Sequence, residues 1–191
     1  MKRLSLYLFL ILFSLQTPSW ADDISEFEIE GMSIGDSLLD FFSKEEIKEN
    51  KYFLYDTKKF ATISKGKELL TVYDYMQLNF NNNDNKYIIK SVEGHINYTK
   101  NIKDCYKKKD EITLEVSDLF SNASKEKYSG THQADESGES IVEAIHFLFV
   151  DNSQIRIACI DWSKQVNHSD YLLIAINSSQ FQYYLDNEAY K

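Results

Sequence analysis

Two different spacings of hydrophobic residues run along this chain, and each change of spacing marks a change of element. Residues 99–120 repeat at helical spacing, with a lysine- and acid-rich face opposite the apolar one. The apolar face carries Ile102, Cys105, Tyr106, Ile112, Val116, Leu119 and Phe120. This pattern predicts one long amphipathic helix with Cys105 on its buried stripe.

Segments rich in β-branched and aromatic residues stand on both sides of this helix and predict strands. They cover residues 52–55, 60–63, 69–80, 87–98, 141–150, 155–162 and 171–176. The asparagine-rich tract 81–85 lies between two of them and favours a hairpin loop, because Asn and Asp tolerate turn geometry. Long strands joined by so short a link predict an antiparallel sheet.

The segment 141–162 predicts a β-hairpin whose register follows from the hydrophobic pattern. A three-residue loop, Asp151–Ser153, would place Ile145 opposite Cys159. In this register the apolar residues of both strands share one side of the hairpin. Cys159 then points toward the core, and a helix carrying Cys105 that packs on this side would bring the two cysteines together.

Shorter patterns predict elements at the two ends of the chain. Residues 24–29 alternate apolar and acidic side chains, as in an edge strand or an extended arm. Residues 34–50 combine helical spacing with two capping sequences and predict a helical hairpin. Ser178 or Ser179 is placed to cap a C-terminal helix.

Strands in runs, with helices grouped between them, are typical of α+β proteins. We expect a mainly antiparallel sheet with an N-terminal helical hairpin, one long amphipathic helix packed on the sheet and a C-terminal helix. Residues 22–191 would form this single globular domain. Within it, residues 121–140 contain no Leu, Ile, Val or Phe and predict a polar loop, either functional or mobile.

The N-terminus has the three parts of a secretory signal peptide. Two basic residues precede an apolar stretch at 4–15, and Ser19 and Ala21 are the small residues that a cleavage site requires. The pattern predicts that residues 1–21 are removed, that no transmembrane segment remains, and that the protein is periplasmic or secreted. The alternative is an uncleaved N-terminal anchor, although an apolar stretch of about twelve residues is short for a membrane span.

The net charge of the protein restricts the classes of molecule that it can bind. The chain of 191 residues contains 30 acidic and 21 basic side chains, so its formal net charge is −9. Removing residues 1–21 takes away two bases and no acid, which leaves 19 bases against 30 acids and a net charge of −11. Such a protein is repelled by nucleic acids and by anionic lipid surfaces, so we expect no nucleic-acid partner.

The chain contains two cysteines, Cys105 and Cys159. In an exported protein they would form one disulfide. In the chain-entropy description, closing a loop of about 55 residues stabilises the fold by roughly 4 kcal/mol. The alternative is a pair of reduced thiols.

One polar segment combines residues that could carry chemistry or binding. It runs from Asp161 to Asp170, at the end of a predicted strand, and includes Trp162 and His168. His168 with Asp161 or Asp170 could act as an acid–base pair, and Trp162 could form the rim of a binding site. The alternative is a hydrogen-bonded turn in which Trp162 closes the edge of the core. The four histidines lack metal-ligand spacing, so we expect no metal and no cofactor.

Three stretches resemble uncharacterised exported bacterial proteins. They are Glu30–Ser43, Cys159–Ser163 and Gln180–Leu185. The resemblance implies no activity, no cofactor and no role for a particular residue.

Together these observations favour an exported, non-catalytic periplasmic protein that binds another protein or a component of the cell envelope. The alternative is a small periplasmic hydrolase that uses the His/Asp pair within residues 161–170. A third possibility is a ligand-storage or cation-binding protein that uses its acidic surface.

Overall fold

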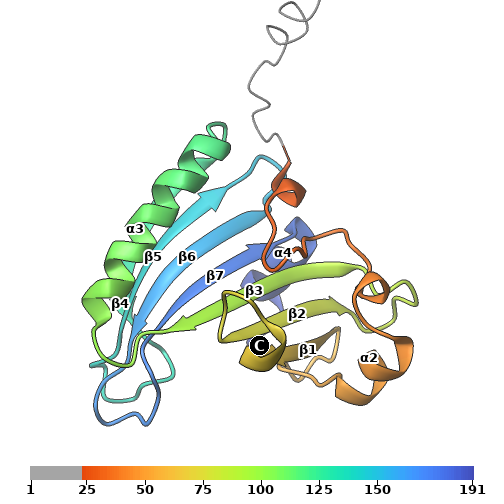
Figure 1. Ribbon diagram of the computed structural model, residues 1–191, viewed down its shortest axis with the longest axis horizontal. Helices are drawn as coiled ribbons and strands as arrows, with labels where there is room; N and C mark the ends of the chain where they lie inside the picture. Colours follow the sequence, from red (N-terminus) through yellow and green to blue (C-terminus); the bar gives the residue numbers. More distant parts are fainter. Residues whose placement is uncertain (1–22) are drawn as a thin grey trace, which may run out of the picture.

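Seven antiparallel strands form one sheet, in the order β1-β2-β3-β7-β6-β5-β4 (Figure 1). The computed structural model describes residues 23–191, so the predicted signal peptide at 1–21 lies outside the described residues. The strands are β1 (Phe60–Gly66), β2 (Tyr75–Asn81), β3 (Ile89–Asn97), β4 (Ser124–Thr131), β5 (Ile141–Leu148), β6 (Gln154–Asp161) and β7 (Tyr171–Asn177). The mainly antiparallel sheet of an α+β protein is confirmed.

The long helix α3 (Ile102–Leu119) packs on one face of the sheet, which we call the helix face. Its buried side chains include Cys105 and Val116, as the helical spacing predicts. Cys105 is disulfide-bonded to Cys159 on β6, with the two Cα atoms 6.0 Å apart. The predicted covalent link between helix and sheet is therefore confirmed, and it is consistent with an oxidising compartment.

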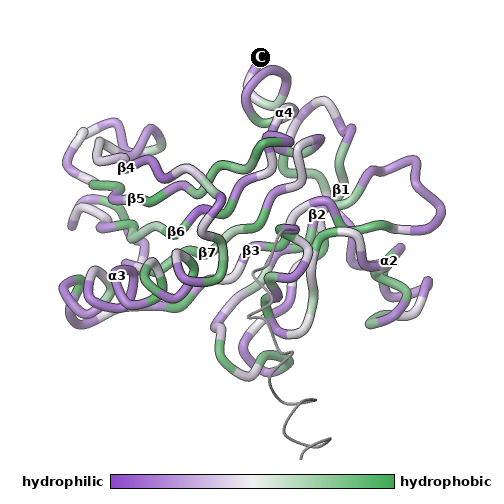
Figure 2. Tube along the Cα trace, turned by 90° about the horizontal axis from the view of Figure 1, so that it is seen from above, coloured by the Kyte–Doolittle hydropathy of each residue, from purple (hydrophilic) through white to green (hydrophobic). Residues whose placement is uncertain are grey.

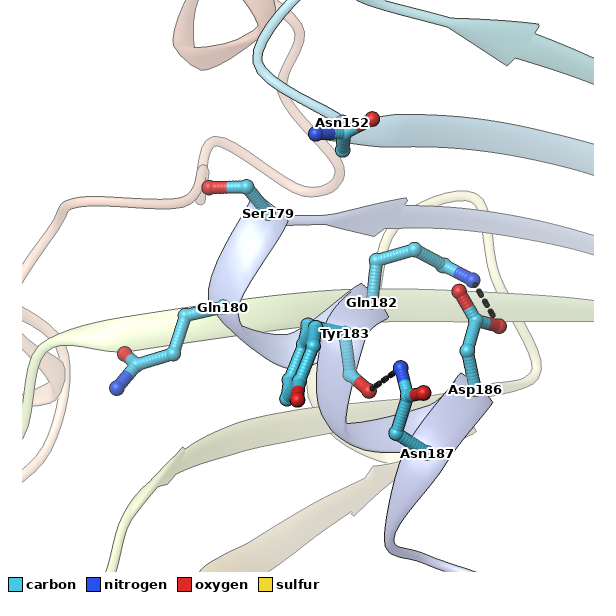
Figure 3. Close-up of a pocket in the computed structure, with 7 residues that line it drawn as sticks. All are labelled: Asn152, Ser179, Gln180, Gln182, Tyr183, Asp186 and Asn187. Carbon is cyan, nitrogen blue, oxygen red and sulfur yellow. Dashed lines mark hydrogen bonds between the residues drawn. The ribbon is translucent and has the colours of Figure 1, made fainter.

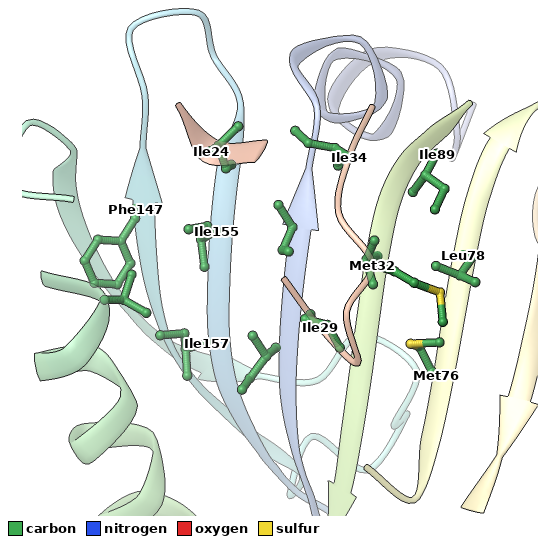
Figure 4. Close-up of a cluster of buried hydrophobic side chains, with 14 of the residues drawn as sticks. Ile24, Ile29, Met32, Ile34, Met76, Leu78, Ile89, Phe147, Ile155 and Ile157 are labelled. Atoms are coloured by element: carbon green, nitrogen blue, oxygen red, sulfur yellow. The ribbon is translucent and has the colours of Figure 1, made fainter. Parts of the chain in front are cut away.

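The rest of the helix face is covered by the N-terminal segment (Figure 4). Ile29 and Met32 belong to the same buried cluster as Leu78 on β2. Two 3-10 turns lie in this segment, η1 (Ile24–Glu26) and η2 (Leu38–Asp40). The stretch expected as an edge strand or arm thus begins with a turn and packs over the sheet instead of extending its edge.

The predicted N-terminal helical hairpin at 34–50 is wrong in its first half. Within this stretch the structure has one α-helix, α2 (Lys44–Asn50), and its predicted capping box at Ser43 is present. Gly35 adopts a φ of 95°, which interrupts helical geometry. The backbone N–H groups of Gly35 and Leu38 donate 3.0 Å hydrogen bonds to carbonyls at and just before the start of β3. These tertiary hydrogen bonds prevail over the local helical spacing.

The polar segment 121–140, predicted as one loop, contains the edge strand β4. This strand pairs with β5 along its whole length, and nearly all of its side chains are exposed. An edge strand that buries almost no side chain shows no apolar signal in its sequence. The prediction failed because hydrophobic content was used as the mark of a strand.

The β5–β6 hairpin has its predicted faces but a different register. Ile145 lies opposite Ile157 rather than opposite Cys159. The tight turn falls at residues 150–152, one position earlier than predicted, where Asn152 adopts a φ of 67°. A shift of two residues keeps every side chain on its own face, so Cys159 still points into the core.

Helix α4 (Ser179–Asn187) lies on the opposite side of the sheet from α3 (Figure 2). Ser178 caps it by accepting a hydrogen bond from the N–H of Phe181, as predicted. Phe181 and Tyr184 pack against Phe60 of β1, so α4 covers one end of this side, which we call the second face. No helix within residues 23–191 combines the length and apolar character needed to cross a bilayer.

Candidate functional site

The second face of the sheet gathers aromatic and titratable side chains from six strands, β2 to β7. Strand pairing places His146 on β5 opposite Arg156 on β6, and His95 on β3 opposite Leu173 on β7. These side chains include Tyr75, Glu93, His95, Tyr128, His146, Arg156 and Tyr171. Between them lie small or aliphatic residues that belong to a separate buried cluster. The arrangement differs from the helix face, which is apolar throughout its centre.

A histidine–carboxylate pair stands on β3 of this face. The Nε2 atom of His95 lies 2.6 Å from Oε1 of Glu93. The His95 ring stacks on Tyr171, with ring centroids 4.6 Å apart and an interplanar angle of 13°. Burial and the Glu93 charge raise the pKa of Tyr171 to about 12, and the Arg156 charge opposes this shift. Tyr171 is therefore a neutral phenol at physiological pH.

Trp162 lies between two histidines at the end of the same face. Its ring centroid is 4.3 Å from that of His132 and 4.9 Å from that of His168. Burial, followed by the Arg156 charge, lowers the pKa of His132, whereas the Asp135 charge raises it. His132 is accordingly neutral at neutral pH and presents an uncharged ring to Trp162.

The loops that carry these rings are tied to each other by hydrogen bonds. The Asp135 carboxylate accepts hydrogen bonds from the hydroxyl groups of Ser140 and Ser137, and these hold its pKa well below its usual range. The Ser140 hydroxyl in turn accepts a 2.9 Å hydrogen bond from the backbone N–H of Ser163. The loop after β4 is thus joined to the loop after β6, which gives the Trp162 end of the face a defined shape.

A shallow hollow of about 510 Å³ opens beside Trp162. It is lined by His95, Asn97, Trp162, Asn167, His168, Ser169 and Tyr171. The rings supply flat apolar surfaces, and the two amides and the hydroxyl supply hydrogen-bond donors and acceptors. Such a combination suits a ligand that has a ring and several polar substituents.

The structure brings together only part of the predicted constellation of Asp161, Trp162, His168 and Asp170. Trp162 and His168 line the hollow together. Asp170 accepts a 2.8 Å hydrogen bond from the backbone N–H of Trp162 and so acts as a turn-stabilising residue. Asp161 accepts a 3.3 Å hydrogen bond from the hydroxyl of Tyr106 on α3, on the other side of the sheet. Within residues 23–191, no hydrogen bond or ion pair joins the His168 ring to either carboxylate.

The environment of Asp161 fits a structural role. Burial is the main cause that raises its pKa, the Asp170 charge adds to the effect, and the hydrogen bond from Tyr106 opposes it. A carboxyl with a raised pKa can serve as an acid or base. Here, however, Asp161 lies against α3 and away from the rings of the hollow.

A second hollow, of about 530 Å³, lies along the outer side of α4 (Figure 3). Two of its polar side chains bond within the helix: Gln182 donates to Asp186, and Asn187 donates to the carbonyl of Tyr183. Tyr183 is the one aromatic side chain that lines this hollow, whereas His95, Trp162, His168 and Tyr171 all line the hollow beside Trp162. We regard the Trp162 hollow as the better candidate site.

Sequence reasoning missed Glu93, His95, Arg156 and Tyr171. The Glu-x-His spacing on a predicted strand was a usable signal, because residues two apart in a strand share a face. Arg156 and Tyr171 carried no such signal, since their neighbours depend on the order of the strands.

Within residues 23–191 there is no group of three or more His, Cys, Asp or Glu side chains that could hold a metal ion. No family model matches the chain, and no curated protein and no solved structure shows significant similarity to it. The resemblance to exported bacterial proteins therefore stays a prediction. What the protein does has to be argued from the site itself.

Proposed function

We propose that this protein is an exported, non-catalytic module that binds a component of the cell envelope in the Trp162 hollow. One observation carries the proposal: Trp162 lies between His132 and His168, beside the stacked pair His95–Tyr171. Ring faces can stack on a ligand, and the amides next to them can form hydrogen bonds with it. The hollow is the size of a small ligand rather than of a protein interface.

Export is supported by two independent features. The N-terminus has the three parts of a signal peptide, and the disulfide between Cys105 and Cys159 is typical of oxidising compartments. The test is mass spectrometry of the protein recovered from the periplasm of a bacterial host. We expect a chain that has lost residues 1–21, and a full-length chain retained in the cytoplasm would contradict export.

Ligand binding is tested by fluorescence of Trp162. Trp20 lies in the segment whose removal is expected, so Trp162 is the tryptophan reporter in a protein produced as residues 22–191. We expect soluble peptidoglycan fragments, released by muramidase, to change the emission in a saturable way. Tyr171→Ala should weaken binding at least tenfold, because it removes one ring of the hollow. Tyr183→Ala, on the outer side of α4, is the matched control and should leave binding unchanged.

Hydrolysis remains a second candidate, favoured by the close approach of Glu93 and His95. A His–carboxylate pair can act as a general base. The sequence also suggested His168 paired with Asp161 or Asp170. This pairing has less support, because both carboxylates are hydrogen-bonded to other groups. Assays with chromogenic esters, amides and glycosides should show no turnover. Turnover that disappears in His95→Gln would replace the binding function with a catalytic one.

A further inference from the structure

The two edges of the sheet differ in what covers them. At the β1 edge the preceding segment folds back along the strand, and Tyr52 and Thr62 exchange two backbone N–H···O=C hydrogen bonds of 2.9 Å. At the β4 edge every residue of the strand except Gly130 is exposed, and Figure 2 shows β4 at the margin of the sheet away from β1. One edge is therefore closed by the chain itself, and the other is open.

The hydrogen bonds beyond the end of β4 show which of its backbone groups face the open edge. The N–H of His132 donates a 2.8 Å hydrogen bond to the carbonyl of Ser140, which continues the register between β4 and β5. Hydrogen-bonded and non-hydrogen-bonded pairs alternate along an antiparallel ladder. The even-numbered residues of β4 therefore bond to β5, and the odd-numbered residues direct their N–H and C=O groups toward the open edge. These residues are Lys125, Lys127, Ser129 and Thr131.

Strand β4 lacks most of the features that protect an edge from other strands. Bulges, prolines, short strands and covering segments are the usual ones, together with charged side chains. Here the pairing with β5 runs over eight residues without a register shift, and the one proline of the chain is Pro18. Charges are present at 125–127, but the Lys125 Nζ is held by a 3.1 Å hydrogen bond to the hydroxyl of Ser117 on α3. The edge is open to a strand whose register keeps these charges apart.

A second copy of β4 meets this condition in one register. When two identical strands pair antiparallel through their odd-numbered residues, the two longest registers are centred on Lys127 and on Tyr128. The first places Lys127 opposite Lys127, and like charges directly opposite each other destabilise a sheet. The second places Tyr128 opposite Tyr128 and Lys127 opposite Ser129. Aromatic pairs stabilise adjacent strands, so the register centred on Tyr128 is favoured.

Tyr128 and Glu126 fit each other in this register. The Tyr128 side chain lies over Gly130, where an added Cβ would come within 2.5 Å of the Tyr128 hydroxyl oxygen. The residue opposite Gly130 is Glu126 of the second copy, so its carboxylate comes next to that hydroxyl. Glu126 is exposed and takes part in none of the ion pairs found between residues 23 and 191. An acceptor and a donor thus meet twice, once on each side of the twofold axis.

We propose that two copies of this protein associate through β4, with Tyr128 on the twofold axis, so that their sheets join into one. The axis is perpendicular to the sheet, so the second faces of the two copies lie on the same side. The joined surface carries two Trp162 hollows, although the association does not depend on what they bind. A contact between two edge strands is smaller than a standard interface, so the dimer dissociates on dilution.

Sedimentation of the protein produced as residues 22–191 is the first test. Physiological ionic strength is used, because it screens the repulsion between two acidic copies. We expect the average mass to rise toward that of a dimer with increasing concentration. Ser129→Pro removes an outward N–H and keeps the bonds to β5, so it should stay folded and monomeric. Ser129→Ala keeps this N–H and is the matched control, which should associate like the unaltered protein.

A single introduced cysteine tests the register. Both native cysteines are joined in the disulfide, so the new thiol is the one that can form a cross-link. Two cysteines at position 128 would have Cα atoms about 4.5 Å apart, within disulfide range, and Tyr128→Cys should give a covalent dimer under mild oxidation. Lys125 lies opposite Thr131 in this register. Lys125→Cys should therefore stay monomeric, because its two thiols would be about 20 Å apart.

The opposite results would overturn the inference. They are a monomer at every concentration, association that persists in a folded Ser129→Pro variant, or no cross-link in Tyr128→Cys. Preferential cross-linking of Lys127→Cys would show the register centred on Lys127, and equal cross-linking of all three cysteine variants would show random collision. Circular dichroism verifies that each variant is folded. If Ser129→Pro does not fold, the cross-linking experiment decides, and neither result bears on ligand binding in the Trp162 hollow.

Discussion

Cys105 on α3 and Cys159 on β6 are joined by a disulfide, with both side chains buried and the two Cα atoms 6.0 Å apart. The bond fastens the long helix to the central part of the sheet. It links residues 54 positions apart in the chain, so it restricts the unfolded state strongly.

Removing this bond should destabilise the protein. We expect the double variant Cys105→Ala/Cys159→Ala to lose about 2–4 kcal/mol of unfolding free energy. Urea denaturation measures the loss, and the unaltered protein under reducing conditions should show a similar shift. An unchanged midpoint in both experiments would mean that packing alone holds α3 on the sheet.

The C-terminal helix should depend on a single aromatic contact. Phe181 is buried, and its ring meets that of Phe60 edge to face at a centroid distance of 5.0 Å. We expect Phe181→Ala to cost about 3–5 kcal/mol, measured by chemical denaturation. Tyr183, on the exposed side of the same helix, is the control, and its replacement by Ala should stay within about 0.5 kcal/mol.

Lowering the pH should decrease the stability of the fold, because two partly buried histidines become protonated. Burial is the main cause that lowers the pKa of both His132 and His146. The native state then binds protons less readily than the unfolded chain, whose histidines have a pKa of about 6.5. Their contribution to stability is complete above that pH and is lost as the pH falls from there through the lowered pKa values.

The double variant His132→Gln/His146→Gln tests this dependence. Its thermal midpoint should fall less between pH 7.5 and pH 5 than that of the unaltered protein. The same fall in both proteins would assign the acid sensitivity to other groups.

The charged form of Asp161 should destabilise the folded protein at neutral pH. Its pKa is raised in the folded state, mainly by burial, so stability decreases as the pH rises from the unfolded value through the folded pKa. We expect Asp161→Asn to raise the thermal midpoint at pH 7 and to have little effect near pH 3, where the carboxyl is protonated. Ligand binding in the Trp162 hollow should not change. A loss of binding would show that Asp161 belongs to the site after all.

The β5–β6 turn should tolerate glycine but not a branched residue at Asn152. This residue has a φ of 67°, in the left-handed region that asparagine and glycine accept most readily. We expect Asn152→Val to cost about 1–2 kcal/mol and Asn152→Gly to be close to neutral. Thermal denaturation compares the two, and equal stability would contradict the assigned turn.

Local patterns were sufficient for several elements. The helical spacing of residues 99–120 predicted α3 with Cys105 buried, and Ser178 predicted the start of α4. The disulfide to Cys159 could also be predicted. The side-chain period directs both cysteines toward the core, and an exported protein favours disulfide formation. These features depend on neighbours in the chain, which the sequence contains directly.

Other features depended on distant contacts. No helix forms at Gly35, despite the local helical spacing, because its backbone is hydrogen-bonded to the region where β3 begins. The edge strand β4 was missed because its order comes from backbone pairing with β5, which leaves no hydrophobic trace. The register of the β5–β6 hairpin slipped by two residues because such a slip preserves both faces, and the hydrophobic pattern cannot distinguish the two alternatives.

By itself the sequence determined the class of fold, the long helix and its disulfide, and the presence of Trp162 and His168 in one polar segment. Only the tertiary structure decided that His95 and Tyr171 lie beside them. The physical reason is the strand order β3-β7-β6, which places residues distant in the chain on adjacent strands. Side-chain period states which face a residue occupies, whereas its neighbours on that face are set by the pairing of the whole sheet.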